Sequence, residues 1–323
     1  MSDEPVLQVN PVGLDTSIGF VGLGVMGSGM AQSLLRKGFR LSAHSRNPAS
    51  ASALVELGAS LDTLAEVAQR ARIILLSLPE TIDVEAVLLG PGGLADGLPP
   101  GSCVIDTSTI SPDGARRFAS VLASKGVAFL DAPVSGGQEA AIRGTLSCMV
   151  GGPRQAFEAC ESVFAAISSR CVHVGEVGSG QITKACNQIA VAASLLGVAE
   201  ALALAARHHV DLETVRTVLL GGAARSFSLE KHGERIINGA FEPGFRAALM
   251  RKDLRLALDS GRQNGNFMPV TATATQLLDV LCNQGGADLD WSALGRLIAE
   301  LSGALPTGRE QGGSNAIQVE RPV

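Results

Sequence analysis

The chain has 323 residues, of which 46% are hydrophobic and 18% are charged, and its formal net charge is −5. This length and apolar content are sufficient for about two globular domains. The charges form no basic stripe, which argues against a nucleic-acid-binding protein. The six cysteines include no Cys-x-x-Cys pair, so we expect reduced, buried thiols and no metal site.

The two ends of the chain have the composition of flexible tails. Residues 1–16 are polar and lack the basic and apolar segments of a signal peptide. Residues 306–323 contain turn formers without an apolar period. The longest apolar candidate for a membrane span, residues 189–204, is rich in alanine and interrupted by Gly197 and Glu200. We therefore expect a soluble, cytoplasmic protein with no membrane partner.

Short β-rich runs alternate with helical patterns over residues 17–178. The early runs are apolar without alternation, as in strands that are buried on both faces. This arrangement predicts a doubly wound, mostly parallel sheet with helices on both sides. The predicted strands are 18–21, 41–44, 73–78, 103–106, 128–131, 146–150 and 171–174. The predicted helices are 28–35, 50–58, 62–70, 83–89, 112–124 and 153–167.

Strand signals end after Gly180. One long helix is predicted over residues 181–208, about 40 Å at a rise of about 1.5 Å per residue. Further helices are predicted at 212–220, 229–237, 246–264, 270–284 and 291–302. The fold class is thus a Rossmann-type α/β domain over residues 17–178 and an all-helical domain over residues 179–305, joined by a long interdomain helix. Such a junction is a favoured place for a ligand site.

The clearest motif is a glycine-rich turn between the first strand and the first helix. Residues 22–27 read GLGVMG, a Gly-x-Gly-x-x-Gly pattern. Gly22 permits a sharp turn, Gly24 lets the backbone approach a pyrophosphate, and Gly27 lets the helix pack close to the strand. The helix adds unpaired N–H groups and the positive end of its dipole. The motif predicts a dinucleotide site, and the alternative is a tight glycine turn without a ligand.

The end of the second strand indicates which dinucleotide binds. In NAD sites an acidic residue at this point usually binds the ribose 2′-OH. Here residues 43–48 read AHSRNP, and the next acid is Glu56. Arg46 suits a 2′-phosphate, because a guanidinium matches phosphate geometry. We therefore expect NADP in preference to NAD, and the alternative is a solvated loop arginine.

Two further strand ends are expected to face the cofactor. Residues 76–79 read LSLP and residues 106–109 read DTST, and strand carboxyl ends line the ligand crevice of such a sheet. The backbone at Leu78 and Pro79 and the hydroxyl of Thr109 are candidates to line the ribose and nicotinamide. The alternative is an ordinary turn or helix cap.

A third strand end, residues 131–137 with the sequence DAPVSGG, has the features of an anion site. Consecutive N–H groups at Gly136 and Gly137 can form a nest, and Ser135 adds a hydroxyl donor. The segment predicts a site for a small carboxylate, and the alternative is a loop that simply requires glycine.

The start of the long helix carries a candidate acid–base group. Lys184 shares a helix face with Asn187 and Gln188, three and four residues further on. Burial near the domain junction would lower the pKa of Lys184 and allow proton exchange near neutral pH. The alternative is a lysine that extends along the helix into solvent. Lys252 and Asp253 either reach the same junction or form a solvated helix pair.

In combination, these motifs resemble the 3-hydroxyacid dehydrogenases. This family includes 3-hydroxyisobutyrate dehydrogenase and tartronate semialdehyde (2-hydroxy-3-oxopropionate) reductase, and it is similar to 6-phosphogluconate dehydrogenase. The resemblance covers residues 18–301 and is carried by the segments 20–27, 131–137, 144–146, 178–188 and 252–254. It implies an NAD(P)-dependent oxidoreductase that reversibly reduces a small semialdehyde acid to a 3-hydroxy acid.

The resemblance also implies roles for individual residues. Lys184 would be the catalytic acid and base, and Asn187 would orient the reacting oxygen. The substrate-binding residues would be Ser135, Gly136, Gly137, Asn187 and Gln188. The cofactor-binding residues would be Gly22, Leu23, Gly24, Val25, Met26, Gly27, Ser45, Arg46, Asn47, Leu78, Pro79, Thr109, Phe245 and Lys252.

Two details resemble the tartronate semialdehyde reductase branch. Gln188 stands where 3-hydroxyisobutyrate dehydrogenases tend to repeat Asn, and residues 46–48 read RNP. Ser45 departs from this branch, which often has Asp there, and Ala140 stands where many members have Gly. The alternatives are a 3-hydroxyisobutyrate or 4-hydroxybutyrate dehydrogenase and, from another class, a non-catalytic dinucleotide sensor. Apolar faces on the predicted helices favour a homodimer or homotetramer.

Overall fold

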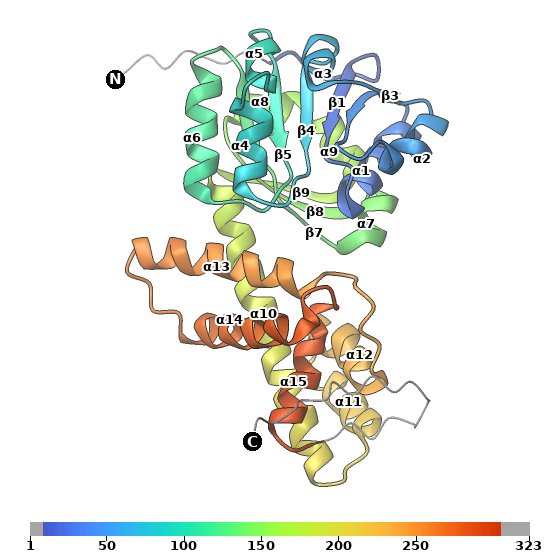
Figure 1. The fold of residues 1–323 in the computed structure, drawn as a ribbon, viewed down its shortest axis with the longest axis vertical. Coiled ribbons are helices and arrows are strands. Elements are labelled where there is room, and N and C mark those ends of the chain that lie inside the picture. The colour runs from blue at the N-terminus through green and yellow to red at the C-terminus, as the bar shows by residue number, and fades with distance from the viewer. Residues whose placement is uncertain (1–8, 305–323) are drawn as a thin grey trace, which may run out of the picture.

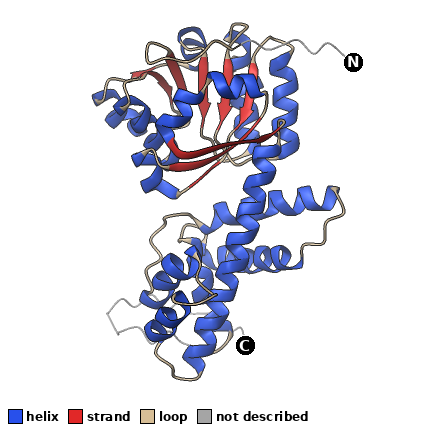
Figure 2. Cartoon of the chain, turned by 180° about the vertical axis from the view of Figure 1, so that it is seen from behind, coloured by secondary structure: helices blue, strands red, loops and turns tan. Residues whose placement is uncertain are grey.

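The computed structural model describes residues 9–304, which form an α/β part and a helical part joined by one long helix, α10 (Figure 1). The strands all lie in the first part, and the second part contains helices and loops (Figure 2). The predicted fold class is confirmed. The division at residues 178 and 179 stays a prediction.

The centre of the α/β part is a run of six parallel strands in the order β3-β2-β1-β4-β5-β6. Ile73 and Leu75 pack into the core on one face of the sheet, while Ile74 and Leu76 pack into the core on the other. This double burial explains the uninterrupted apolar runs. The strands are β1 (Ser17–Val21), β2 (Arg40–His44), β3 (Ser60–Leu61), β4 (Ile73–Leu76), β5 (Cys103–Asp106) and β6 (Ala128–Asp131).

Helices cover both faces of this sheet, and each set encloses its own hydrophobic core. The first set is α1 (Val25–Arg36), α2 (Ser52–Glu56), α7 (Gly137–Arg143), α8 (Arg154–Ala159) and α9 (Glu161–Ile167). The second set is α3 (Leu64–Arg70), α4 (Thr81–Leu89), α5 (Leu94–Gly97) and α6 (Pro112–Ala123).

Three more strands extend the sheet beyond β6. They are β7 (Val134–Ser135), β8 (Leu146–Gly151) and β9 (Ser168–Gly175). β8 runs antiparallel to β6 and β7 and parallel to β9. In Figure 1 these strands lie at the edge of the α/β part that faces the helical part. The turn after β7 is therefore presented towards the junction.

The helical part is organised around α10 (Ser179–Arg207). The remaining helices are α11 (Leu212–Leu220), α12 (Gly233–Asn238), α13 (Ala247–Gln263), α14 (Pro269–Leu281) and α15 (Leu294–Leu301). α10 contacts β6, β8 and β9 in the α/β part and α13, α14 and α15 in the helical part. Figure 1 shows it passing from the sheet through the helical part as a single rod.

Several elements differ from the sequence-based expectation. The helix expected over 153–167 is two helices, since the chain breaks helical geometry at Cys160. The short elements β3, β7, α5 and α7 were not predicted, because two- to seven-residue segments carry little periodicity. Residues 9–16 were assigned to a tail, yet Val12 is buried and its backbone bonds to Ala159 and Ser162. The predicted tail at 306–323 lies outside the described residues.

α10 contains the interrupted apolar run at residues 189–204. Within residues 9–304 it is the one helix that is long and apolar enough to cross a bilayer. A search for uninterrupted apolar residues overlooks it, because Gly197 and Glu200 interrupt the run without much reducing its mean hydropathy. Here its apolar residues contribute to the helical core, as Leu195, Leu202 and their neighbours are buried there.

Candidate active site

The glycine turn after β1 has the geometry that a pyrophosphate site requires. Gly22 has φ of +97°, and a Cβ on Gly27 would lie 1.9 Å from the Gly22 carbonyl oxygen. A Cβ on Gly24 would meet nothing within 4 Å. Gly24 is the N-cap of α1, and the first turn of α1 has neither a side-chain cap nor an acid. The first-turn N–H groups of α1 are thus not capped by a side chain, and the space beside Gly24 is open, so the residues fit a dinucleotide.

The loop after β2 presents hydroxyl groups and one arginine. The Ser45 Oγ lies 2.8 Å from the Ser50 Oγ and accepts a hydrogen bond from the Asn47 N–H at 3.2 Å. Arg46 is 84% exposed, and its Nη2 lies 3.8 Å from the Asp83 Oδ1. The exposed guanidinium of Arg46 is therefore accessible to an anion, and its role towards a 2′-phosphate stays a prediction. The proximity of Asp83 to Arg46 was not predicted, because the two residues are 37 positions apart in the sequence and lie on different elements.

An acid that comes close to this loop, Asp62, is already occupied. The Asp62 carboxylate accepts hydrogen bonds from the Ser42 hydroxyl at 2.7 Å and from the Arg70 guanidinium at 2.7 Å. The Ser60 hydroxyl also donates to it. The side chain of Asp62 is only 6% exposed, so this carboxylate is not available to a ribose.

The carboxyl ends of β4 and β5 are tied together beside the glycine turn. The Leu78 N–H donates to the Ser108 Oγ at 2.8 Å, and the Ser108 N–H donates to the Asp106 Oδ1 at 3.0 Å. Asp106 is fully buried, its Oδ2 has no hydrogen-bond partner among residues 9–304, and burial raises its pKa to about 7. This pair of turns is a fixed platform that carries Pro79 and Thr109.

A buried carboxylate at the end of β6 anchors α10. Asp131 accepts hydrogen bonds from the Gly178 N–H at 2.8 Å and the Gln181 N–H at 2.9 Å. Burial raises the pKa of Asp131 to about 6, although these donors oppose the shift. Gln181 in turn donates to the Ser108 carbonyl and accepts from the Ile110 N–H. Neither side chain was predicted to have this role, although an acid that ends a buried strand signals such pairing.

The turn after β7 has the backbone conformation that an anion nest requires. Gly136 and Gly137 have φ of +136° and +74°, and a Cβ on Gly137 would meet nothing within 4 Å. Ser135 is paired with Ser147 in the sheet. The Cβ of Ala140 lies 2.9 Å from where a Cβ on Gly136 would be, so Ala140 packs beneath the turn. Positive φ at both glycines explains why the turn requires them.

Lys184 is a buried cation in the second turn of α10. It is 7% exposed, and burial lowers its pKa, with the charge of Asp253 acting in the opposite direction. Next to it along the helix, the Asn187 Nδ2 donates to the Gln188 Oε1 at 2.8 Å. Lys184 is therefore buried, as one of the two interpretations of the sequence expected, and does not extend into solvent.

A chain of polar contacts links α10 through α13 to the strand ends. The buried Gln188 donates to the Asp253 Oδ2 at 2.7 Å, and the Asp253 Oδ1 lies 3.1 Å from the Lys252 Nζ. The Lys252 ammonium also donates to the carbonyl oxygens of Pro79 at 3.0 Å and Thr109 at 2.5 Å. Lys252 and Asp253 thus reach the junction. Thr109 meets Lys252 through its backbone, whereas the sequence had suggested its hydroxyl as a lining group.

Phe245 lies on the helical side, before the start of α13. Its N–H donates to the Asp290 Oδ2 at 3.0 Å, and its side chain packs against the helical core.

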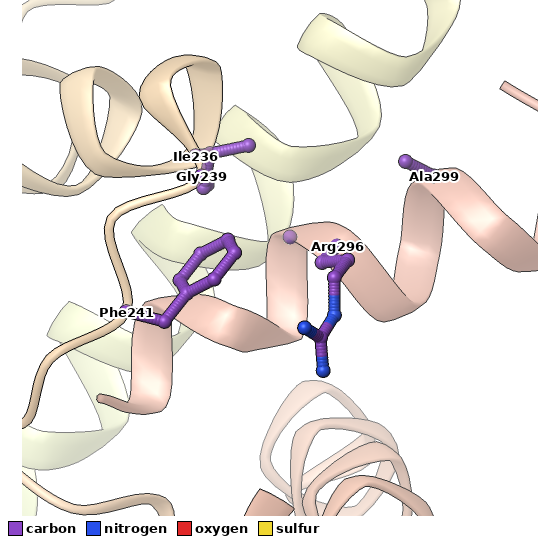
Figure 3. A pocket seen from close by; sticks show the side chains of 6 residues that line it. Ile236, Gly239, Phe241, Arg296 and Ala299 are labelled. Carbon is purple, nitrogen blue, oxygen red and sulfur yellow. The ribbon is translucent and has the colours of Figure 1, made fainter. Parts of the chain in front are cut away.

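A hollow of about 190 Å³ lies elsewhere in the helical part (Figure 3). It is lined by residues of α12, of α15 and of the loop that follows α12, among them Phe241 and Arg296. None of the predicted site residues lines that hollow. Within residues 9–304 no cluster of three or more His, Cys, Asp or Glu side chains is placed to hold a metal.

Two family models together match most of the chain. The model described as the NAD binding domain of 6-phosphogluconate dehydrogenase matches residues 17–175. The model described as NAD-binding of NADP-dependent 3-hydroxyisobutyrate dehydrogenase matches residues 178–298. The two matches fall on the α/β part and on the helical part.

Individual relatives agree with these matches. The chain is 42% identical to 2-hydroxy-3-oxopropionate reductase of Escherichia coli K12, over 86% of this chain and 95% of the relative. It is 33% identical to mitochondrial 3-hydroxyisobutyrate dehydrogenase of Mus musculus, over 88% of each chain. A crystal structure of 3-hydroxyisobutyrate dehydrogenase from Salmonella typhimurium superposes with a TM-score of 0.80 at 30% identity, covering 88% of this chain and 100% of that one.

A glycine turn fitted to a dinucleotide, together with this fold and these relatives, defines an NAD(P)-dependent oxidoreductase that acts on a CH–OH group. The alternative of a non-catalytic sensor is therefore set aside. More narrowly, the chain belongs to the 3-hydroxyacid dehydrogenase family, as its motifs had predicted.

Proposed function

We propose that this protein catalyses the reversible, NADP(H)-dependent reduction of tartronate semialdehyde (2-hydroxy-3-oxopropionate) to the corresponding 3-hydroxy acid. The observation that carries the proposal is the 42% identity to a 2-hydroxy-3-oxopropionate reductase along 95% of that enzyme. Gln188 after Asn187 supports the same branch. The protein is expected to act in the cytoplasm.

Substrate binding is assigned to the turn after β7 and to α10. The N–H groups of Gly136 and Gly137 and the hydroxyl of Ser135 would receive the carboxylate. Both glycines have positive φ, and the space beside Gly137 is open. Asn187 would orient the reacting oxygen. Its amide is itself held by Gln188, which Asp253 holds in turn.

Proton transfer is assigned to Lys184. During reduction its ammonium would donate a proton to the carbonyl oxygen as that oxygen gains negative charge, and during oxidation the neutral amine would remove the hydroxyl proton. Burial lowers the pKa of Lys184, which brings both forms closer to working pH. The bound nicotinamide supplies or accepts the hydride.

Cofactor binding is assigned to the carboxyl ends of β1, β2, β4 and β5. The 22–27 turn would hold the pyrophosphate, while Leu78, Pro79 and Thr109 would lie beside the ribose and nicotinamide. Lys252 holds the turns that carry Pro79 and Thr109 by donating to the carbonyl oxygens of these two residues. The exposed Arg46, with no acid at position 45, supports a preference for NADP.

A substrate panel with both cofactors tests the proposal. Initial rates would be followed by nicotinamide absorbance with tartronate semialdehyde and with the semialdehydes that correspond to 3-hydroxyisobutyrate and 4-hydroxybutyrate. We expect the highest kcat/KM with tartronate semialdehyde and NADPH. A higher kcat/KM with either of the other semialdehydes would overturn the substrate assignment. Arg46→Ala should lower kcat/KM with NADPH and leave that with NADH nearly unchanged.

The second candidate is 3-hydroxyisobutyrate dehydrogenase. It is supported by the 33% identity to the mouse enzyme and by the TM-score of 0.80 to the Salmonella typhimurium structure. The same panel separates the two candidates.

We also propose a homodimer or homotetramer. No residue of α11 is buried in the single chain, and Val218 and Leu204 are 68% and 63% exposed. Burial of these apolar side chains in a second copy would stabilise an assembly. Light scattering of the purified protein measures the number of chains, and a monomer at micromolar concentration would contradict this proposal.

A further inference from the structure

Arg46 and Asp83 meet across the carboxyl end of β1. Arg46 follows β2, and Asp83 lies in the first turn of α4, which follows β4. β1 lies between β2 and β4 in the sheet and ends at the glycine turn. The two side chains form an ion pair of 3.8 Å beside the carboxyl ends of β1 and β2. The adenosine half of a dinucleotide bound at the glycine turn would extend towards this side of the sheet.

Asp83 differs from the other carboxylates near this edge. Asp62 is held by Ser42, Ser60 and Arg70, and Glu85 of α4 forms a two-point pair with Arg117 at 2.7 and 2.6 Å. The Asp83 side chain is 27% exposed, and its ion-pair partner is Arg46. A carboxylate in the first turn of a helix is also stabilised by the helix dipole, so the charge of Asp83 keeps a favourable interaction when Arg46 turns away.

We propose that Asp83 is a specificity-determining residue that competes with the 2′-phosphate of NADP for Arg46. The inference rests on the cofactor preference proposed above and concerns how that preference is limited. When Arg46 is paired with Asp83, its guanidinium is not free for a phosphate. When it turns to the phosphate, the Asp83 carboxylate remains nearby as a like charge. Both effects weaken the binding of NADP and leave the binding of NAD unaffected.

The size of the effect follows from the exposure of the pair. A pair with an arginine that is 84% exposed is screened by water and worth little, about two- to fivefold in an equilibrium constant. Removal of the like charge adds to this at short range. We therefore expect Asp83→Asn to tighten NADP⁺ binding about three- to tenfold.

Calorimetric titration of the purified protein with NADP⁺ and with NAD⁺ tests the inference without using turnover. The variants are Asp83→Asn, Arg46→Ala and the double variant. Glu85→Gln is the matched control, because it removes the same charge from the same helix but from a carboxylate held by Arg117. The expected result is tighter NADP⁺ binding in Asp83→Asn, unchanged NAD⁺ binding, and a smaller gain when Arg46 is absent.

Two results would overturn the role of Asp83 alone: no gain for NADP⁺ in Asp83→Asn while Arg46→Ala weakens NADP⁺ binding, or an equal gain for both dinucleotides. A gain of the same size in Glu85→Gln would also overturn it, because the effect would then be one of net charge. If Arg46→Ala leaves NADP⁺ binding unchanged, the proposed cofactor preference fails and the role of Asp83 fails with it.

Discussion

Two lysines at the junction differ in their surroundings and therefore in their chemistry. Lys252 is saturated by the Asp253 carboxylate and two backbone carbonyl oxygens. Lys184 is almost fully buried, and desolvation lowers its pKa. A saturated ammonium is suited to holding structure, whereas a desolvated ammonium gives up its proton more readily. This contrast is the physical reason to assign proton transfer to Lys184.

Replacement of this group tests the assignment at the residue scale. Lys184→Ala should lower kcat by about 10²- to 10⁴-fold, the usual contribution of a positioned acid or base. Dinucleotide affinity should change little, and the melting temperature should not fall, because a buried charge is removed. Steady-state rates and calorimetry measure the two effects. Near-normal turnover in this variant would contradict the role of Lys184.

The direction of the Lys184 shift also predicts opposite pH profiles. Reduction requires the ammonium, so its rate should fall as pH rises through the pKa of Lys184. Oxidation requires the neutral amine, so its rate should rise through the same pKa. Because burial lowers this pKa, both changes should occur below the value of about 10.4 for free lysine. Rates of both directions across a pH series measure it, and two parallel profiles would be inconsistent with a single lysine.

At the scale of elements, the β1–α1 unit separates two requirements for glycine. Gly27 allows α1 to approach the strand, because any Cβ there would collide with the Gly22 carbonyl. Gly24 faces open space and has φ of −71°, which other residues adopt readily. Gly27 is thus required by folding, whereas position 24 requires glycine only if a ligand approaches the backbone there.

A pair of alanine variants distinguishes these requirements. Gly27→Ala should lower the free energy of unfolding by about 1–3 kcal/mol or more, the usual cost of overpacking. Gly24→Ala should leave that free energy nearly unchanged and weaken dinucleotide binding. Urea unfolding and calorimetric titration provide the readouts. If Gly24→Ala binds the dinucleotide as tightly as the parent chain, the pyrophosphate lies elsewhere.

At the scale of the whole molecule, two sets of contacts join the parts. Asp131 and Gln181 fix the beginning of α10 to β5 and β6. Lys252 connects α13 to the turns after β4 and β5. The candidate proton donor, Lys184, lies on α10 between Gln181 of the first contact and Gln188, which donates to Asp253 beside Lys252. Its position therefore depends on both contacts.

Loss of the second contact should therefore affect stability and catalysis together. Lys252→Met leaves the Asp253 carboxylate buried with Gln188 as its donor but without the Lys252 cation, and should lower the free energy of unfolding by about 1–3 kcal/mol. It should also raise the KM for the cofactor. Lys231→Met, at an exposed lysine of the helical part, is the control and should change neither quantity. Urea unfolding and initial rates measure both, and equal effects in the two variants would contradict the role of Lys252.

The sequence was informative where chemistry and local geometry coincide. The GLGVMG turn and the buried central strands were predicted from residues that are neighbours in the chain. The pairing of Arg46 with Asp83, and of Lys252 with Thr109, was not predicted as such, because each depends on the order of strands in the sheet. The turn at Gly136 was expected, but β7 and α7 on either side were too short to show a period.

The geometry of α10 restricts which insertions and deletions such an enzyme can tolerate during evolution. Because it is one uninterrupted helix, each residue added to its middle would rotate everything beyond by about 100° and advance it by about 1.5 Å. A one-residue insertion between Gln181 and Gln188 would thus rotate Gln188, and the α13 residue Asp253 that it holds, relative to the strand ends, and would separate Lys252 from the Pro79 and Thr109 carbonyls. Surface loops can gain or lose residues with little effect on the rest of the fold. The length of α10 is restricted, because it sets the orientation of the helical part relative to the strand ends.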